Sequence, residues 1–313
     1  MKPKIYLSPL SGVSDLAFRL ISREHGAQFC FFEMIAAKAL VYSHTKTLGL
    51  LKTNKLDKPI AAQLLGRDPD VMLDAAHRLI NIADISFLDV NCGCPVNKVI
   101  KNHSGAYLLQ DTKTLRAILK KLTSNLKIPV TVKIRTGFDR RKVTESQKIA
   151  KICEDSGVSS LFVHGRTKSQ GYSGDVDYEA IRAIKEVLKI PVFGSGNIFN
   201  GVLAKKMLDD TGCDGILVAR GALGNPWAFG EIETYLKTGT LSEAPTRLER
   251  KKILIKHLSY IKKYKELSEM GKVGFMRKIT MWYAKGFPGA KEMRKAICSA
   301  DNYKNLLAVA RKI

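Results

Sequence analysis

The sequence lacks long hydrophobic runs. Within its 313 residues no stretch of eighteen or more apolar residues occurs, which excludes a transmembrane helix and a membrane partner. Residues 1–9 include the charged Lys2 and Lys4 and hold no apolar segment of the length that a secretory signal needs. We therefore expect a cytoplasmic protein.

Cysteine is scarce and scattered, at Cys30, Cys92, Cys94, Cys153, Cys213 and Cys298. In a chain for which no secretion is expected, this pattern argues against a disulfide framework. One residue separates Cys92 from Cys94, and no second Cys or His pair follows at zinc spacing, so no metal site is predicted. The glycine fingerprint of dinucleotide-binding folds is also absent, which leaves a preference between NADPH and NADH open.

Acidic residues are few. The chain has 52 Lys and Arg against 29 Asp and Glu, a net charge of +23. Residues 245–313 alone carry eighteen Lys and Arg against five Asp and Glu, a net charge of +13. Such an excess indicates a polyanionic partner, although a lysine-rich composition with a solvated helical tail would also produce it.

Short apolar, β-branched runs alternate with helix-like segments, which is typical of βα units and a parallel sheet. Thr144 and Gln147 have the spacing of a capping box at a helix start. The segment Leu126-Lys-Ile-Pro-Val130 recurs 62 residues later as Leu188-Lys-Ile-Pro-Val192, a spacing of two βα units. Eight strands are predicted, near Ile5–Ser8, Phe29–Glu33, Ile60–Leu64, Phe87–Asn91, Val130–Ile134, Leu161–His164, Val192–Gly194 and Ile216–Ala219.

Eight strands within about 225 residues favour an α/β fold of the closed (β/α)8 TIM-barrel type, with an open doubly wound sheet as the alternative. Residues 1–236 are predicted to form the barrel, residues 237–246 a linker, and residues 247–313 a basic domain made only of helices. Within that domain we expect helix breaks at Gly271, at residues 286–289 and at residues 301–302.

Glycine-rich loops follow the last two predicted strands. They are Gly194-Ser-Gly-Asn-Ile198 and Ala219-Arg-Gly-Ala-Leu-Gly-Asn-Pro226. In a barrel, phosphate commonly binds in these two loops, because glycine lets backbone N–H groups approach it closely. Arg220 adds a positive charge, so we predict a ligand that carries phosphate.

Polar side chains also stand at four other strand ends, where a barrel core would not need them: Gln63, Asn91, Cys94, Lys133, Arg135, His164 and Arg166. Buried Lys and Gln are costly unless paired, so Lys133 and Gln63 are expected to face a ligand. Cys94 precedes Pro95 in a loop, whereas Cys30 and Cys153 lie within apolar runs. The Cys94 thiol is therefore expected to be accessible, as a nucleophile or as a proton donor.

These residues together resemble the dihydrouridine synthase family, flavoproteins that reduce particular uridines in tRNA, and the bacterial B-type subgroup is the most similar. The resemblance runs over nearly the whole chain. Its motifs are Ser8-Pro-Leu-Ser-Gly-Val-Ser-Asp15, Ala62-Gln-Leu-Leu-Gly66, Asp89-Val-Asn-Cys-Gly-Cys-Pro95, Val132-Lys-Ile-Arg-Thr-Gly137, Val163-His-Gly-Arg-Thr167, Gln170-Gly-Tyr-Ser-Gly174 and the two glycine loops.

The resemblance implies a TIM barrel with FMN across its mouth. Pro9, Leu10 and Ser11 would lie beneath the ring system, Gln63 and Lys133 at its edge, and His164, Ser195, Gly196, Asn197, Ala219 and Arg220 at the phosphate, with Asn91 and Arg135 near flavin or uracil. The chain departs from the family at two places. Relatives often have Asn-Gly-Asp at residues 195–197 and Gly at residue 219, so side-chain contacts there are less secure than backbone contacts.

The resemblance also implies a reaction. NADPH would reduce FMN, and a uridine of tRNA would then flip into the barrel, receive hydride at C6 and receive a proton at C5 from Cys94, since an ordinary thiol is protonated at neutral pH. The basic helical domain would hold the tRNA, and a monomer that binds no DNA is expected. Two alternatives stay open: a small-molecule FMN barrel of the dihydroorotate or enoate reductase type, and a non-catalytic RNA-binding barrel.

Overall fold

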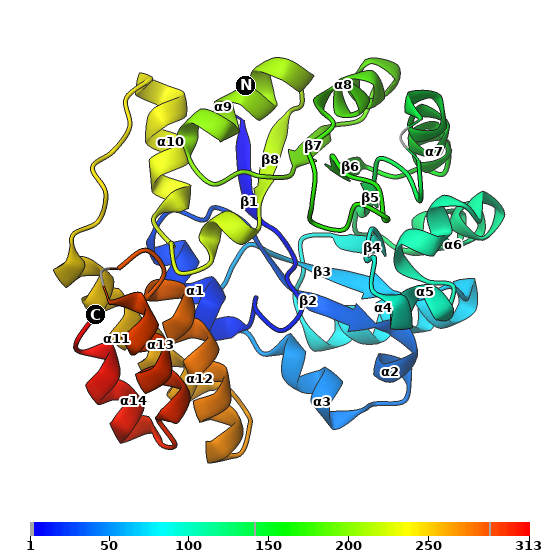
Figure 1. Cartoon of the computed structure of the whole chain (residues 1–313). Helices are drawn as coiled ribbons and strands as arrows, with labels where there is room; N and C mark the ends of the chain where they lie inside the picture. The colour runs from blue at the N-terminus through cyan, green and yellow to red at the C-terminus, as the bar shows by residue number, and fades with distance from the viewer. Residues whose placement is uncertain (1–2, 141, 288) are drawn as a thin grey trace.

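The computed structural model describes residues 3–140, 142–287 and 289–313, and in them eight parallel strands form one sheet (Figure 1). Neighbouring strands follow the order β1-β8-β7-β6-β5-β4-β3-β2. A bridge between Tyr6 and Phe29 joins β1 to β2, and the Leu7 N–H donates to the Phe29 carbonyl at 2.8 Å. The predicted TIM barrel is thus confirmed, and the open sheet is excluded.

The strands are β1 (Lys4–Leu7), β2 (Cys30–Ala36), β3 (Ile60–Leu65), β4 (Leu88–Cys92), β5 (Val130–Arg135), β6 (Ser160–His164), β7 (Val192–Ser195) and β8 (Gly215–Val218). The helices of the barrel are α1 (Leu16–Glu24), α2 (Ala37–Val41), α3 (Thr45–Leu48), α4 (Pro69–Ile82), α5 (Asn97–Lys101), α6 (Thr112–Asn125), α7 (Val143–Asp155), α8 (Tyr178–Val187), α9 (Gly201–Thr211) and α10 (Ala228–Thr238). Short 3₁₀ turns cover Gly49–Leu51, Gly105–Leu109 and Arg220–Ala222. After residues 239–246, which form neither helix nor strand, come α11 (Arg247–Tyr264), α12 (Glu269–Tyr283), α13 (Ala290–Ser299) and α14 (Tyr303–Ala310).

Three local predictions need correction. Strand β2 continues to Ala36 rather than ending at Glu33, and a bulge between Phe31 and Met34 shifts its register against β3. The predicted capping box at Thr144 is wrong, because α7 begins one residue earlier and Thr144 lies inside its first turn. Gly271 does not separate two helices: its N–H donates to the Ser268 side chain, which caps the start of α12.

Aromatic side chains fill the lower part of the barrel, toward the amino ends of the strands. Tyr6, Phe31, Phe162 and Phe193 point inward, and neighbouring rings among these four lie with centroids 4.9–6.2 Å apart. Aromatic pairs at such distances pack favourably beyond their buried area. Space for a ligand therefore remains only toward the carboxyl ends.

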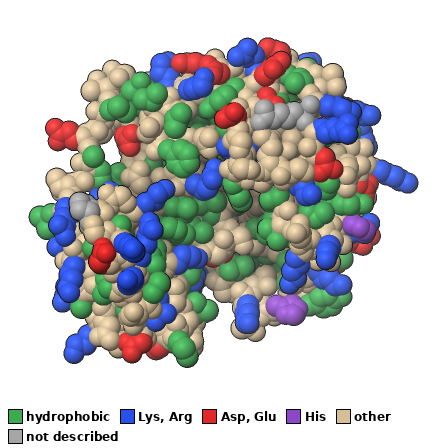
Figure 2. Space-filling view, in the orientation of Figure 1, with side chains coloured by type: hydrophobic (Ala, Val, Ile, Leu, Met, Phe, Trp, Pro, Cys, Tyr) green, Lys and Arg blue, Asp and Glu red, His purple; other side chains and the backbone are tan. Residues whose placement is uncertain are grey.

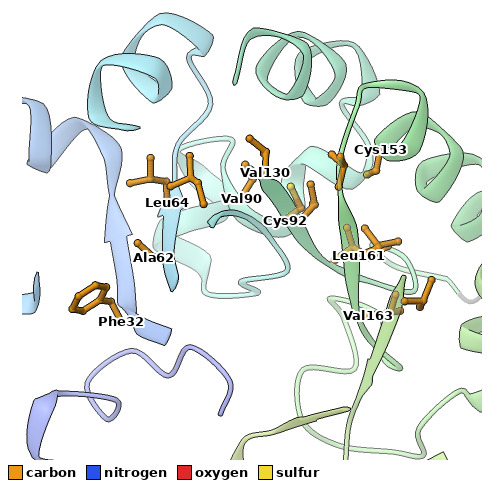
Figure 3. Packing of buried hydrophobic residues seen from close by; sticks show 14 of the residues in the cluster. Phe32, Ala62, Leu64, Val90, Cys92, Val130, Cys153, Leu161 and Val163 are labelled. Atoms are coloured by element: carbon orange, nitrogen blue, oxygen red, sulfur yellow. The ribbon is translucent and has the colours of Figure 1, made fainter. Parts of the chain in front are cut away.

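The outward faces of the strands pack against the surrounding helices. Figure 3 shows this cluster, in which Cys92 of β4 lies among Val90, Val130 and Leu161 near Cys153 of α7. Burial raises the pKa of the Cys92 thiol well above its usual range. Cys92 is therefore a packing residue, unlike Cys94 two residues later.

The four C-terminal helices pack against one side of the barrel, beside α1 (Figure 1). Their apolar cluster takes in Ala17 of α1. Polar contacts flank this interface: Lys256 pairs with Glu24 at 2.7 Å, and Lys265 pairs with Asp15 at 2.7 Å. Throughout the described ranges, no helix combines the length and the apolar character needed to cross a bilayer.

Candidate active site

A cavity of about 580 Å³ opens at the carboxyl ends of the strands, and Figure 2 shows this face hollowed at the centre of the barrel. Its volume lies in the range of small-molecule and cofactor sites. Every residue that the sequence singled out as catalytic, cofactor-binding or substrate-binding lines it: Pro9, Leu10, Ser11, Gln63, Asn91, Cys94, Lys133, Arg135, His164, Ser195, Gly196, Asn197, Ala219 and Arg220.

Cys94 is partly exposed to this cavity, and its loop is firmly held. The Asn91 side-chain oxygen accepts hydrogen bonds from the Cys94 N–H at 2.9 Å and from the Gly93 N–H at 3.1 Å. On the other side Gly105 has φ +64°, and a Cβ there would lie 2.9 Å from the Cys94 carbonyl oxygen. A side chain at position 105 would displace the loop, so Gly105 fixes where the thiol lies.

A chain of buried hydrogen bonds supports Asn91 from below. Asn91 Nδ2 donates to Gln63 Oε1 at 2.7 Å, and Gln63 Nε2 donates to Asp89 Oδ2 at 2.6 Å. The Thr131 hydroxyl donates to the other Asp89 oxygen at 2.6 Å. Asp89 was not among the predicted site residues. Inward positions alternate along β4 and β5, and this period of two would have pointed to Asp89 and Thr131.

Burial raises the pKa of Asp89 to about 7. The hydrogen bonds from Thr131 and Gln63 and the charge of Lys133 act in the opposite direction, but their effect is smaller. The folded protein thus holds this proton more tightly than the unfolded chain does, and the free energy of unfolding falls as pH rises from about 4 to about 7. An asparagine cannot ionise, and it can still accept from Gln63 and donate to the Thr131 hydroxyl oxygen. The melting temperature of Asp89→Asn relative to wild type should therefore be higher at pH 8 than at pH 5, by the equivalent of up to about 3 kcal/mol.

Thermal unfolding of both proteins across this pH range measures the difference. A difference that stays constant with pH would show that Asp89 does not carry the predicted proton.

Lys133 presents an unpaired cation to the cavity. Within the part of the chain that the structure describes, its Nζ atom has no hydrogen-bond or ion-pair partner. Burial and, after it, the charge of Arg135 lower the pKa of Lys133 to about 8. An ammonium group in this position is suited to a ligand on which negative charge develops.

The loops after β7 and β8 form a wall suited to an anion. Gly196 has φ +131° and Asn197 has φ +51°, so the loop after β7 turns its backbone in a way that favours glycine and asparagine. Asn197 Oδ1 accepts from Arg220 at 3.2 Å and from Arg166 at 3.1 Å. A Cβ on Gly221 would lie 2.1 Å from the Ile198 carbonyl oxygen, so the two loops approach closely only with glycine there.

His164 lies beside these cations. Burial, reinforced by the charges of Lys133, Arg135, Arg166 and Arg220, lowers the pKa of His164 to about 2. The imidazole is therefore neutral at pH 7 and serves as a hydrogen-bonding group. A phosphate dianion would find the Arg220 guanidinium and a neutral histidine in this corner, with the buried Arg166 behind Asn197.

Two parts of the cavity wall were not foreseen. The β2 bulge brings Met34 into register with Gln63 and into the cavity, where its sulfur accepts from Asn91 at 3.2 Å. Tyr172 is 60% exposed at the mouth, with the Arg135 and Arg220 guanidinium carbons 5.7 and 5.2 Å from its ring centroid. The sequence holds Tyr172 within the motif at residues 170–174, but nothing local marked it as a wall of the site.

Arg135 ties loops together at this mouth. Its Nε donates to the Gly93 carbonyl at 2.7 Å, and its Nη1 donates to the carbonyls of Thr167 at 2.9 Å and Gly171 at 2.8 Å. The contact of Arg135 with a substrate remains a prediction, as does that of Asn91, whose side chain supports the Cys94 loop. No cluster of metal-ligating side chains occurs among the described residues.

The fold and this cavity define a (β/α)8-barrel enzyme with its site at the carboxyl ends of the strands. A sequence profile described as Dihydrouridine synthase (Dus) matches residues 6–312. The chain is 38% identical over 314 residues to a probable tRNA-dihydrouridine synthase of Rickettsia conorii, which covers 100% of this chain and 93% of that protein. It is 37% identical over 291 residues to tRNA-dihydrouridine synthase B of Pseudomonas aeruginosa, covering 93% and 86% of the two chains. The chain belongs to the dihydrouridine synthase family, and it is an oxidoreductase.

Solved structures share the barrel at low sequence identity. A 6-hydroxypseudooxynicotine amine oxidase of Pseudomonas geniculata matches with a TM-score of 0.55 and 15% identity, over 74% of this chain and 47% of that one. A 2-naphthoyl-CoA reductase matches with a TM-score of 0.56 and 12% identity, over 74% and 49%. The likeness spans about half the length of those proteins and shows the fold alone.

Proposed function

We propose that this protein reduces specific uridines of tRNA to 5,6-dihydrouridine, with FMN as the bound cofactor and NADPH as the electron donor. The observation that carries the proposal is the gathering of an accessible thiol, an unpaired ammonium group and an anion-binding corner around one cavity at the barrel mouth. The relatives' names specify tRNA and dihydrouridine, and the thiol and the ammonium group suit a reduction that needs a proton and a counter-charge.

The described residues fit FMN. The Gly196 and Asn197 backbone, with Arg220 and His164, would hold the phosphate, since this corner offers positive charge and room for a close backbone approach. When bound, the flavin supplies hydride transfer. Lys133, which lines the same cavity from β5 and lacks a protein partner among the described residues, would stabilise negative charge that develops beside its ammonium group.

Residues 9–11 and Gln63 would contact the ring system. Because one Gln63 N–H already donates to Asp89 and its oxygen accepts from Asn91, its orientation is set before any ligand arrives. Such preorganisation reduces the ordering needed on binding.

Cys94 would act as the general acid that protonates uracil C5, while C6 receives the hydride. Asn91 holds the Cys94 backbone N–H, so the thiol keeps its place at the cavity wall during the reaction. A uridine within a stacked stem could not reach this depth, so the substrate base must flip out of the RNA.

We propose that residues 1–236 form the catalytic domain and that residues 247–313 form the tRNA-binding domain. Residues 237–246 link the two. Charge supports it, since the last 69 residues carry +13 of the net +23. We propose a cytoplasmic monomer that does not bind DNA. Which uridine is reduced depends on how these helices orient the whole tRNA.

The direct test combines the purified protein, FMN, NADPH and unmodified tRNA, with dihydrouridine measured by mass spectrometry of the digested RNA. We expect a yellow protein whose NADPH oxidation is accompanied by a mass increase of about 2 Da in one or more uridines, the mass of two added hydrogens. A colourless protein would favour a non-catalytic RNA-binding barrel. Turnover of orotate or an enone, without any of tRNA, would favour a small-molecule reductase.

The proposed RNA grip makes its own prediction. Lys291, Arg294 and Lys295 are exposed on α13, and reversing all three to Glu should weaken tRNA binding by about tenfold or more at about 0.1 M salt. A plot of the logarithm of the binding constant against the logarithm of the salt concentration should become shallower. Its slope should change by about 0.7 to 0.9 for each phosphate that the variant no longer neutralises. Binding measured by filter retention across a salt series gives both quantities.

The matched control reverses three exposed lysines of the barrel wall, Lys113 and Lys120 of α6 and Lys148 of α7, which lie across the barrel from the C-terminal helices (Figure 1). This control changes the net charge equally. An equal loss of affinity in both triple variants would contradict a dedicated grip by the C-terminal helices.

A further inference from the structure

The loop between β1 and α1 is the part of the cavity wall that the C-terminal helices touch. Pro9, Leu10 and Ser11 line the cavity, and Gly12 next to them has φ +71°. Inside the loop, the Val13 N–H donates to the Leu10 carbonyl at 3.0 Å. The N–H and the carbonyl of Gly12 find their partners outside the loop.

The first partner comes from the barrel. Glu33, in the bulged part of β2, is only 4% exposed, and its Oε2 accepts a hydrogen bond from the Gly12 N–H. Burial raises the pKa of Glu33, and this hydrogen bond opposes the shift. The regular register of β2 and β3 resumes at Met34, which lines the cavity. The same bulge therefore positions Glu33 against Gly12 and Met34 against the cavity.

The second partner comes from α12. Lys278 Nζ donates to the Gly12 carbonyl at 2.5 Å, and its ammonium lies 4.2 Å from the centroid of the Phe275 ring. Lys265 lies 3.9 Å from the same ring centroid and pairs with Asp15, which caps the start of α1. Cation–aromatic contacts of this kind restrict where an ammonium group can lie.

We propose that Lys278 is a positioning residue of the flavin loop. By holding the Gly12 carbonyl while Glu33 holds the Gly12 N–H, it keeps residues 9–11 in the conformation that lines the cavity. The C-terminal helices therefore set the flavin affinity of the barrel, in addition to binding RNA. The identity of the ligand rests on the proposed function.

The physical reason is conformational. Glycine at a loop apex has wide backbone freedom. When only a fraction of the protein molecules have the loop in the binding conformation, the apparent affinity for the ligand is reduced by that fraction. Removing one of the two partners of Gly12 leaves its backbone held by a single hydrogen bond, so the loop samples more conformations. The residues that line the cavity are unchanged, so the substitution should lower the affinity for FMN and leave the rate of the bound flavin's reaction unchanged.

The test titrates FMN, without RNA, into flavin-free protein and follows flavin fluorescence. Lys278→Met should weaken FMN binding by about tenfold, equivalent to about 1.4 kcal/mol, and Lys278→Arg should restore most of it. The matched control is Lys272→Met, which removes the same charge from the same helix at a lysine that pairs with Glu269. This control should leave FMN affinity unchanged.

Melting temperatures separate positioning from general stability. Lys278→Met and Lys272→Met should unfold at similar temperatures, and a large drop confined to Lys278→Met, matched by its loss of FMN, would overturn a positioning role. Equal FMN affinities of the two methionine variants would overturn the inference alone. Failure of the wild-type protein to bind FMN would overturn the proposed function, and this inference with it.

Discussion

Replacing Cys94 with alanine is expected to abolish dihydrouridine formation while leaving FMN binding and NADPH oxidation nearly unchanged. Cys94 is the cysteine that lines the cavity, and the proposed reaction needs an acid there only for the final proton. General acids contribute about 10²- to 10⁴-fold, so product formation should fall by at least about 10²-fold. Dihydrouridine in the RNA and NADPH consumption, measured in the same reaction, separate the two steps.

The matched control is Cys298→Ala, since Cys298 is exposed on α13 away from the cavity. It removes an exposed thiol without touching the barrel. Full conversion of tRNA by the Cys94→Ala variant would assign the proton to water or to another side chain.

Replacing Lys133 with methionine is expected to slow NADPH-dependent flavin reduction by about 10²- to 10³-fold, the usual effect of losing one preorganised charge-stabilising group. Methionine fills similar space without the ammonium group. The same cation also predicts a pH dependence. With a pKa of about 8, Lys133 is charged below that pH, so the reduction rate should fall as pH rises through about 8.

Lys133→Arg tests that assignment, because arginine stays charged far above this range. The variant should retain part of the activity and lose the alkaline fall. Stopped-flow measurement of the reductive step alone is the appropriate assay, since the proposed role of Cys94 lies in the later reduction of uridine. An alkaline fall that persists unchanged in Lys133→Arg would place the titrating group elsewhere.

The barrel could be predicted from the sequence because each βα unit carries its own signals. Apolar runs and their spacing located seven of the eight strands to within one residue. Only β2 departed, since its bulge depends on pairing with β3 and leaves no mark in the period of its own residues.

The lining of the site was predictable for a related reason. In parallel barrels the strand ends converge on one face, so polar residues at successive strand ends, such as Lys133 and His164, must meet there. What could not be predicted were the supports behind them. The bond between Lys278 and Gly12 joins residues 266 positions apart, and the roles of Asp89 and Tyr172 depend on neighbours brought by other strands and loops.

The aromatic layer of Tyr6, Phe31, Phe162 and Phe193 limits the routes by which ligands can enter the barrel. It fills the barrel axis beneath the cavity, so the proposed electron donor and the proposed RNA base could not approach from opposite ends. Under the proposed function both would use the same mouth, one after the other, and a double-displacement order of events would be the expected kinetic scheme. During the second half of the proposed cycle, the RNA itself would close the mouth of the cavity.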